Sequence, residues 1–147
     1  MTDAEDIVLA VEGLSVALPP GAERRHAVEA ASFTLARRET LCLVGESGSG
    51  KSITARAIMG LLPAPRLAAS AGRIRFGGED LLRLPPERLR AIRGSEIAMI
   101  FQEPMTALNP LMTIGGQIDE VLRAHIKLAR AARRARVLAL LADVHLP

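Results

Sequence analysis

The chain has 147 residues, of which 49% are hydrophobic and 24% are charged, and its formal net charge is +3. This length and composition predict a folded globular domain rather than a disordered chain. Three phenylalanines are its only aromatic residues, since tryptophan and tyrosine are absent. We therefore do not expect a nucleic-acid-binding module that stacks bases on exposed rings.

Cysteine content and hydropathy narrow the setting further. Cys42 is the one cysteine, which excludes an intrachain disulfide and favours a reducing, cytoplasmic compartment. The acidic first six residues do not match a secretion signal. No run reaches 18 apolar residues, so any membrane association would have to come through partners. The basic residues between Arg123 and Arg136 predict a solvent-facing helix surface rather than a nucleic-acid-binding face.

Short alternating segments predict β-structure in the first half of the chain. Residues 7–11 and 14–18 indicate two strands on either side of Glu12-Gly13. Residues 32–35 alternate as a strand with one wet face does, and residues 73–76 form a similar segment that ends at a glycine pair.

Two other runs, residues 40–44 and 97–101, are apolar on both faces. This pattern is typical of parallel strands that helices cover on both sides. Helices are predicted at residues 53–62 and at residues 86–92, where a proline stands in the first turn. Helical spacing returns at residues 118–126 and 137–144.

One motif carries recognisable chemistry. It fits the phosphate-binding pattern G-x-x-x-x-G-K-[ST] at every fixed position, and its residues are Gly45, Glu46, Ser47, Gly48, Ser49, Gly50, Lys51 and Ser52. Glycines let consecutive backbone N–H groups face one anion, and the following helix adds its positive end. Lys51 would contact the β- and γ-phosphates, and the Ser52 hydroxyl would bind Mg²⁺. The apolar run before the motif and the amphipathic helix after it favour a nucleotide site over a structural turn.

The motif resembles the phosphate-binding loop of ABC-transporter ATP-binding subunits. Residues 97–110 (IAMIFQEPMTALNP) resemble the glutamine-loop region of the oligopeptide, dipeptide and nickel importer subfamily. Residues 72–82 (GRIRFGGEDLL) are similar to the antiparallel hairpin that the family places between these motifs. The resemblance extends over residues 8–147.

This resemblance implies an α/β fold: an incomplete P-loop nucleotide-hydrolase core, an antiparallel β subdomain and the start of a helical subdomain. Residues 1–147 would be the N-terminal part of one domain. Within it, the following ranges are expected: antiparallel β-structure at 1–39 and 70–82, the loop strand and helix at 40–62, the glutamine loop at 97–110, and helices at 111–147.

The resemblance also implies ligands and partners. Gln102 would contact Mg²⁺ and the attacking water and would sense a transmembrane partner. The expected ligands are ATP and Mg²⁺. The expected partners are transmembrane permease subunits and a second ATP-binding subunit, at the cytoplasmic face of the inner membrane, with no nucleic acid.

Three features depart from the family pattern. Leu18 stands where an aromatic residue usually stacks on adenine. Arg38 stands where the family usually has a glycine before the glutamate, here Glu39, and its side chain is expected to face solvent. The family's signature loop, second acidic strand end and switch histidine would follow residue 147. Residues 114–117 resemble the signature loop, but they lack its Leu-Ser start and follow the glutamine loop too closely. Residues 140–143 resemble the acidic strand end, but Val144 occupies the position of the catalytic glutamate and the apolar residues keep helical spacing. Both segments are predicted to be structural. His125 is predicted to be a core or boundary residue of a helix.

The sequence thus predicts Mg·ATP binding without hydrolysis. Glu103 follows Gln102, but nothing in the sequence places its carboxylate behind the γ-phosphate. Two parallel strands cannot cover both of their faces, so the isolated chain is expected to be unstable. Two other functions remain open: a soluble P-loop kinase or GTPase that uses the arginines of residues 130–136 as a lid, and a non-catalytic nucleotide-binding module.

Overall fold

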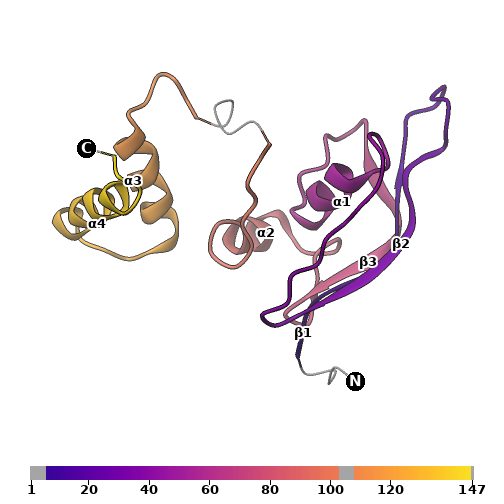
Figure 1. Ribbon diagram of the computed structural model, residues 1–147, viewed down its shortest axis with the longest axis horizontal. Coiled ribbons are helices and arrows are strands. Elements are labelled where there is room, and N and C mark those ends of the chain that lie inside the picture. The colour runs from indigo at the N-terminus through magenta and orange to yellow at the C-terminus, as the bar shows by residue number, and fades with distance from the viewer. Residues whose placement is uncertain (1–5, 103–107, 147) are drawn as a thin grey trace. The chain divides into compact units, whose positions relative to one another are not determined.

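The computed structural model describes residues 6–102 and 108–146. They form two units, Met1–Arg90 and Ala91–Pro147, and the division falls within helix α2 (Pro86–Ile92). The first unit contains a β-sheet and helix α1 (Lys51–Ile58), and the second contains the helix pair α3 (Ile114–His125) and α4 (Arg130–Asp143) (Figure 1).

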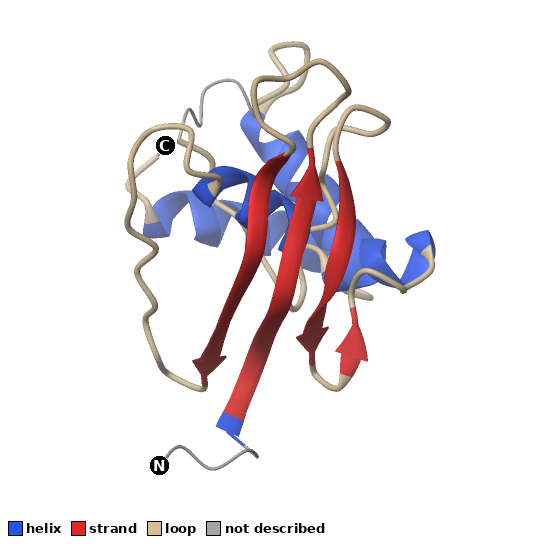
Figure 2. Ribbon diagram, turned by 90° about the vertical axis from the view of Figure 1, so that its right-hand side faces the viewer, coloured by secondary structure: helices blue, strands red, loops and turns tan. Residues whose placement is uncertain are grey.

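The sheet of the first unit has four antiparallel strands in the order β2-β1-β3-β4. Their bounds are β1 (Ile7–Ala17), β2 (His26–Ala36), β3 (Ala68–Phe76) and β4 (Glu79–Asp80). Figure 2 shows them side by side. The two strands expected at residues 7–11 and 14–18 are one strand, β1, whose pairing register shifts between Val11 and Leu14. Gly13 in this bulge has a φ of 58°, a conformation that glycine adopts without steric cost.

The core of the first unit lies on one face of this sheet. Its fully buried side chains from β1 and β3 are Val11, Leu14, Val16 and Ile74. Each such side chain contributes about 1.5–3 kcal/mol when it leaves water. Helix α1 contacts β2 and buries Ala57.

Helix α2 has the bounds that the sequence predicts, with Pro86 as its first residue. Arg88 joins it to β4, because its guanidinium contacts the Glu79 carboxylate at 2.6 Å. This hydrogen bond holds the pKa of Glu79 below its ordinary value of 4.5.

The two runs expected to be parallel strands are not strands. Residues 40–44 and 97–101 pair with no strand of the described chain, apart from a single bridge between Ile97 and Arg93. None of their apolar side chains is buried, and Val44 and Ile100 are 90% and 94% exposed. An apolar pattern states what a segment can bury, whereas a strand forms only when a neighbour accepts and donates its backbone hydrogen bonds.

In the second unit, α3 and α4 pack against each other and bury Leu122 and Val137. Thr113 caps α3 by accepting a hydrogen bond from the Gly116 N–H at 3.1 Å. Arg133 of α4 donates to the Asp119 carboxylate of α3 at 2.8 Å, which lowers the pKa of that carboxyl. None of the helices in the described chain is both long and apolar enough to cross a membrane.

Candidate phosphate-binding site

Helix α1 begins at Lys51, directly after Gly50, and this junction requires glycine. Gly50 has a φ of 93°, and a β-carbon there would lie 2.4 Å from the carbonyl oxygen of Ala27 on β2. The Gly50 carbonyl accepts two hydrogen bonds from buried Thr54, one from its backbone N–H at 2.8 Å and one from its hydroxyl at 3.0 Å. The end of the loop is therefore fixed against the sheet.

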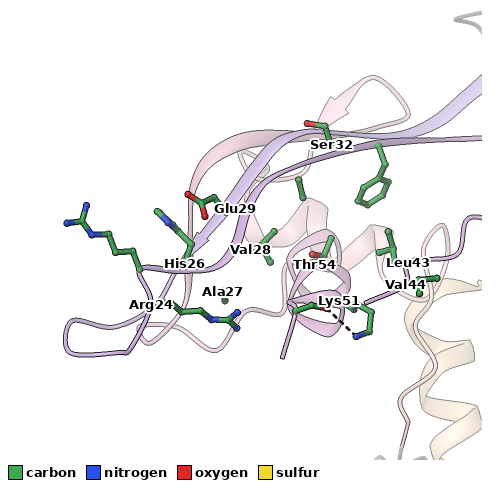
Figure 3. A pocket seen from close by; sticks show the side chains of 14 residues that line it. Arg24, His26, Ala27, Val28, Glu29, Ser32, Leu43, Val44, Lys51 and Thr54 are labelled. Carbon is green, nitrogen blue, oxygen red and sulfur yellow. Dashed lines mark hydrogen bonds between the residues drawn. The ribbon is translucent and has the colours of Figure 1, made fainter. Parts of the chain in front are cut away.

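The Lys51 ammonium lies over the loop that precedes its own helix. It donates to the carbonyl oxygens of Gly45 and Glu46, each at 2.7 Å, and to the Ser49 hydroxyl at 3.3 Å. Figure 3 shows the last of these contacts as a dashed line. The loop thus wraps around the ammonium group of Lys51.

The backbone at the start of α1 presents free donors. Within residues 6–102 and 108–146, no oxygen accepts a hydrogen bond from the backbone N–H groups of Lys51, Ser52 and Ile53. No side-chain cap replaces these acceptors, because the N-cap residue is Gly50. Unpaired N–H groups and the positive end of the helix dipole favour an anion at this position.

A cavity of about 860 Å³ opens beside this helix end. Its volume is within the range of small-molecule sites. Three basic side chains line it, against the single carboxylate of Glu29, so its electrostatic potential favours an anionic ligand. These cations are Arg24, Arg25 and Lys51 (Figure 3).

The comparison with known families agrees with this geometry. The family model described as ABC transporter matches residues 28–147. The chain belongs to the ABC transporter family. It is 46% identical over 140 residues to the dipeptide transport ATP-binding protein DppD of Bacillus subtilis, which covers 95% of this chain and 42% of that protein.

A second curated relative and a solved structure also match this chain. The chain is 51% identical over 137 residues to the peptidoglycan transport ATP-binding protein YejF of Agrobacterium fabrum, which covers 93% of this chain and 25% of that protein. It therefore spans between a quarter and about two-fifths of the length of these curated relatives. The ATP-binding cassette MJ0796, solved as a dimer bound to ADP and Pi, has a TM-score of 0.77 at 22% identity, covering 95% of this chain and 58% of that one. This likeness confirms the predicted fold class, a partial mixed α/β cassette with an antiparallel sheet.

The eight predicted loop residues of this ABC transporter chain lie together in the first unit, with Ser52 exposed in the first turn of α1. Gln102 belongs to the second unit and is exposed. The parallel strand expected directly before Gln102, at residues 97–101, is not formed. Glu103 lies outside the described residues.

The structure also describes the other residues that the sequence singled out. His125, expected in a core or boundary position, is exposed at the end of α3. Residues 114–117 begin α3 and residues 140–143 lie in α4, so both segments are helical. Arg38 is exposed, as expected, and has a φ of 63° in the turn after β2.

Sequence reasoning missed one residue of the site. Arg24, in the loop between β1 and β2, donates from Nη2 to the carbonyl oxygen of Gly48 at 2.5 Å. Nothing in the sequence signals this contact, because 24 residues separate the two partners and Arg24 belongs to no motif. Only the return of β2 beside α1 brings them together.

The described residues contain no group of three or more histidine, cysteine, aspartate or glutamate side chains that could hold a metal ion by themselves. A hydroxyl such as that of Ser52 suits Mg²⁺ only together with oxygens from another source. Phosphate oxygens commonly complete magnesium sites of this kind.

Proposed function

We propose that this chain is part of the ATP-binding subunit of an ABC importer for peptides, and that residues 45–52 bind Mg·ATP. The observation that carries the proposal is the loop itself, in which the Lys51 ammonium and the unpaired N–H groups of α1 meet. Residues 1–147 would be the N-terminal part of one cassette domain with the subdivisions that the sequence predicts.

The residues of the loop have separate roles in this proposal. The backbone N–H groups would hold the phosphates, Lys51 would neutralise the β- and γ-phosphates, and the Ser52 hydroxyl would bind Mg²⁺. The contact of Gln102 with Mg²⁺ stays a prediction of the family resemblance. Mg²⁺, when bound, supplies charge neutralisation to the transferred phosphoryl group. These functions require positioning and electrostatics rather than covalent chemistry by the protein.

Hydrolysis requires more than this cradle. An attacking water must be oriented, and of the residues that line the cavity only Glu29 carries a carboxylate. We therefore expect the chain to bind Mg·ATP but not to turn it over alone. A kinase with a lid of arginines is less well supported, because Arg133 of that cluster is bound to Asp119 within the helix pair.

The relatives support peptides as the transported solute. DppD is named for dipeptide transport, and a Brucella abortus relative, 49% identical over 140 residues, is named as a putative peptide import protein. Transmembrane permease subunits and a second ATP-binding subunit would complete the transporter, at the cytoplasmic face of the inner membrane. The dimeric form of the cassette MJ0796 supports the second subunit.

The test is uptake in cells whose chromosomal copy of this gene carries Lys51→Ala. We expect uptake of a labelled dipeptide or oligopeptide to fall to the level of a deletion strain. The control is Arg66→Ala, which removes an equal charge from an exposed loop position. Peptide uptake that persists in the Lys51→Ala strain, with the deletion strain defective, would contradict the proposed role of this loop.

A further inference from the structure

Arg24, in the loop between β1 and β2, contacts the phosphate-binding loop. Leu18 and Arg25 close the hairpin through a hydrogen bond from the Leu18 N–H to the Arg25 carbonyl at 2.9 Å. Just before that closure, Arg24 extends toward the end of α1 that carries Lys51 (Figure 3). Its Nη2 atom donates to the Gly48 carbonyl at 2.5 Å.

This contact leaves most of the guanidinium available. An arginine has five N–H donors in a rigid plane and stays charged at every physiological pH. No carboxylate in residues 6–102 or 108–146 forms an ion pair with Arg24. The bond to a neutral carbonyl orients the guanidinium without neutralising it, and such a group is well suited to bind phosphate.

The position of Gly48 places this charge at the anion site. Gly48 lies in the loop whose Gly45 and Glu46 carbonyls hold the Lys51 ammonium. Arg24 and Lys51 also line the same cavity. An anion that entered this cavity and reached the N–H groups of α1 would therefore lie between cations from two different elements.

We propose that Arg24 is a second phosphate-binding cation of this site and contacts the polyphosphate of the bound nucleotide. The inference rests on the proposed nucleotide binding and deepens it. Leu18 offers no ring on which adenine could stack, so phosphate contacts must supply a larger share of the affinity. Arg24 provides such a contact from outside the motif.

The test compares three variants of the full chain by titration calorimetry with Mg·ATP and with inorganic tripolyphosphate. Arg24→Gln keeps an N–H donor for the Gly48 carbonyl but removes the charge. We expect this variant to bind both ligands about 10-fold more weakly, because it loses a charge-assisted hydrogen bond. Arg24→Lys should recover most of the loss. Arg66→Gln removes the same charge from an exposed loop that does not line the cavity, and should change either affinity less than about 2-fold.

Several results would overturn the proposal. Unchanged affinity in Arg24→Gln would mean that the side chain only positions Gly48. Loss for Mg·ATP but not for tripolyphosphate would assign Arg24 to the base or ribose. An equal loss of affinity in Arg66→Gln would mean that the effect comes from the net charge of the chain and not from a contact of Arg24. Failure of the proposed nucleotide site is distinguishable, because the unsubstituted chain would then bind neither ligand or would bind both equally well after Lys51→Ala.

Discussion

The antiparallel sheet and the two apolar runs at residues 40–44 and 97–101 differ sharply, although both are rich in β-forming residues. In the sheet, Leu14 and Ile74 are completely buried. In the runs, Val44 and Ile100 are almost completely exposed. The sheet is built from strands that find antiparallel neighbours in the first unit, whereas the runs pair with no strand of the described chain.

This difference shows that the apolar pattern and the partner are separate requirements. Antiparallel strands can pair through short local connections, as β3 and β4 do through a glycine pair. Parallel strands need a crossover and neighbours distant in sequence. The phosphate-binding loop lies where the two kinds of region meet, since residues 40–44 lead into it and β2 holds its end.

The largest expected effect sharpens this comparison directly. Leu14→Ala should lower the free energy of unfolding by about 2–5 kcal/mol, because it opens a cavity in the core of the first unit. Val44→Ala should change it by less than about 0.5 kcal/mol, since that side chain is exposed. Urea unfolding of both variants measures the difference. A Val44→Ala cost equal to that of Leu14→Ala would mean that residues 40–44 are packed in solution.

The next effect concerns two glycines of the loop. Gly50→Ala should cost about 2–4 kcal/mol, from the left-handed backbone and from collision with the Ala27 carbonyl. Gly48→Ala should cost only about 1–2 kcal/mol, because its φ is 79° but no atom lies within 4 Å of the added carbon. Thermal unfolding of the two variants is the measurement. Equal costs would show that β2 does not hold the end of the loop.

A smaller, stabilising effect is expected at Arg38. This residue has a left-handed backbone in the turn after β2, which the Glu39 carboxylate closes by accepting from the Ala36 N–H at 2.6 Å. Arg38→Gly should raise the free energy of unfolding by about 0.5–1 kcal/mol, because glycine adopts this φ without strain. Arg37→Gly, one residue earlier in the same turn, is the control and should not stabilise. A lower free energy of unfolding in the Arg38→Gly chain would contradict the inference that the Arg38 backbone is strained.

The sequence was a good guide where structure is local. The bounds of α2, and the strand with a tight turn at residues 73–78, follow from glycines, prolines and alternation, and these signals act over a few residues. The phosphate-binding role of residues 45–52 stays a prediction. The single strand β1 could not be foreseen, because Gly13 signals a turn as readily as a bulge. The sequence could not predict that residues 40–44 pair with no strand, or that Arg24 contacts Gly48. Both outcomes depend on segments distant in sequence, and a local pattern carries no information about them.

The central claim is that residues 45–52 bind Mg·ATP through Lys51. Titration calorimetry of the chain with Mg·ATP, before and after Lys51→Ala, tests it most directly. We expect one bound nucleotide per chain and a loss of affinity of about 100-fold in the variant, since the bound phosphate loses its cationic donor. Equal affinity in Lys51→Ala, or no binding by the unsubstituted folded chain, would contradict it.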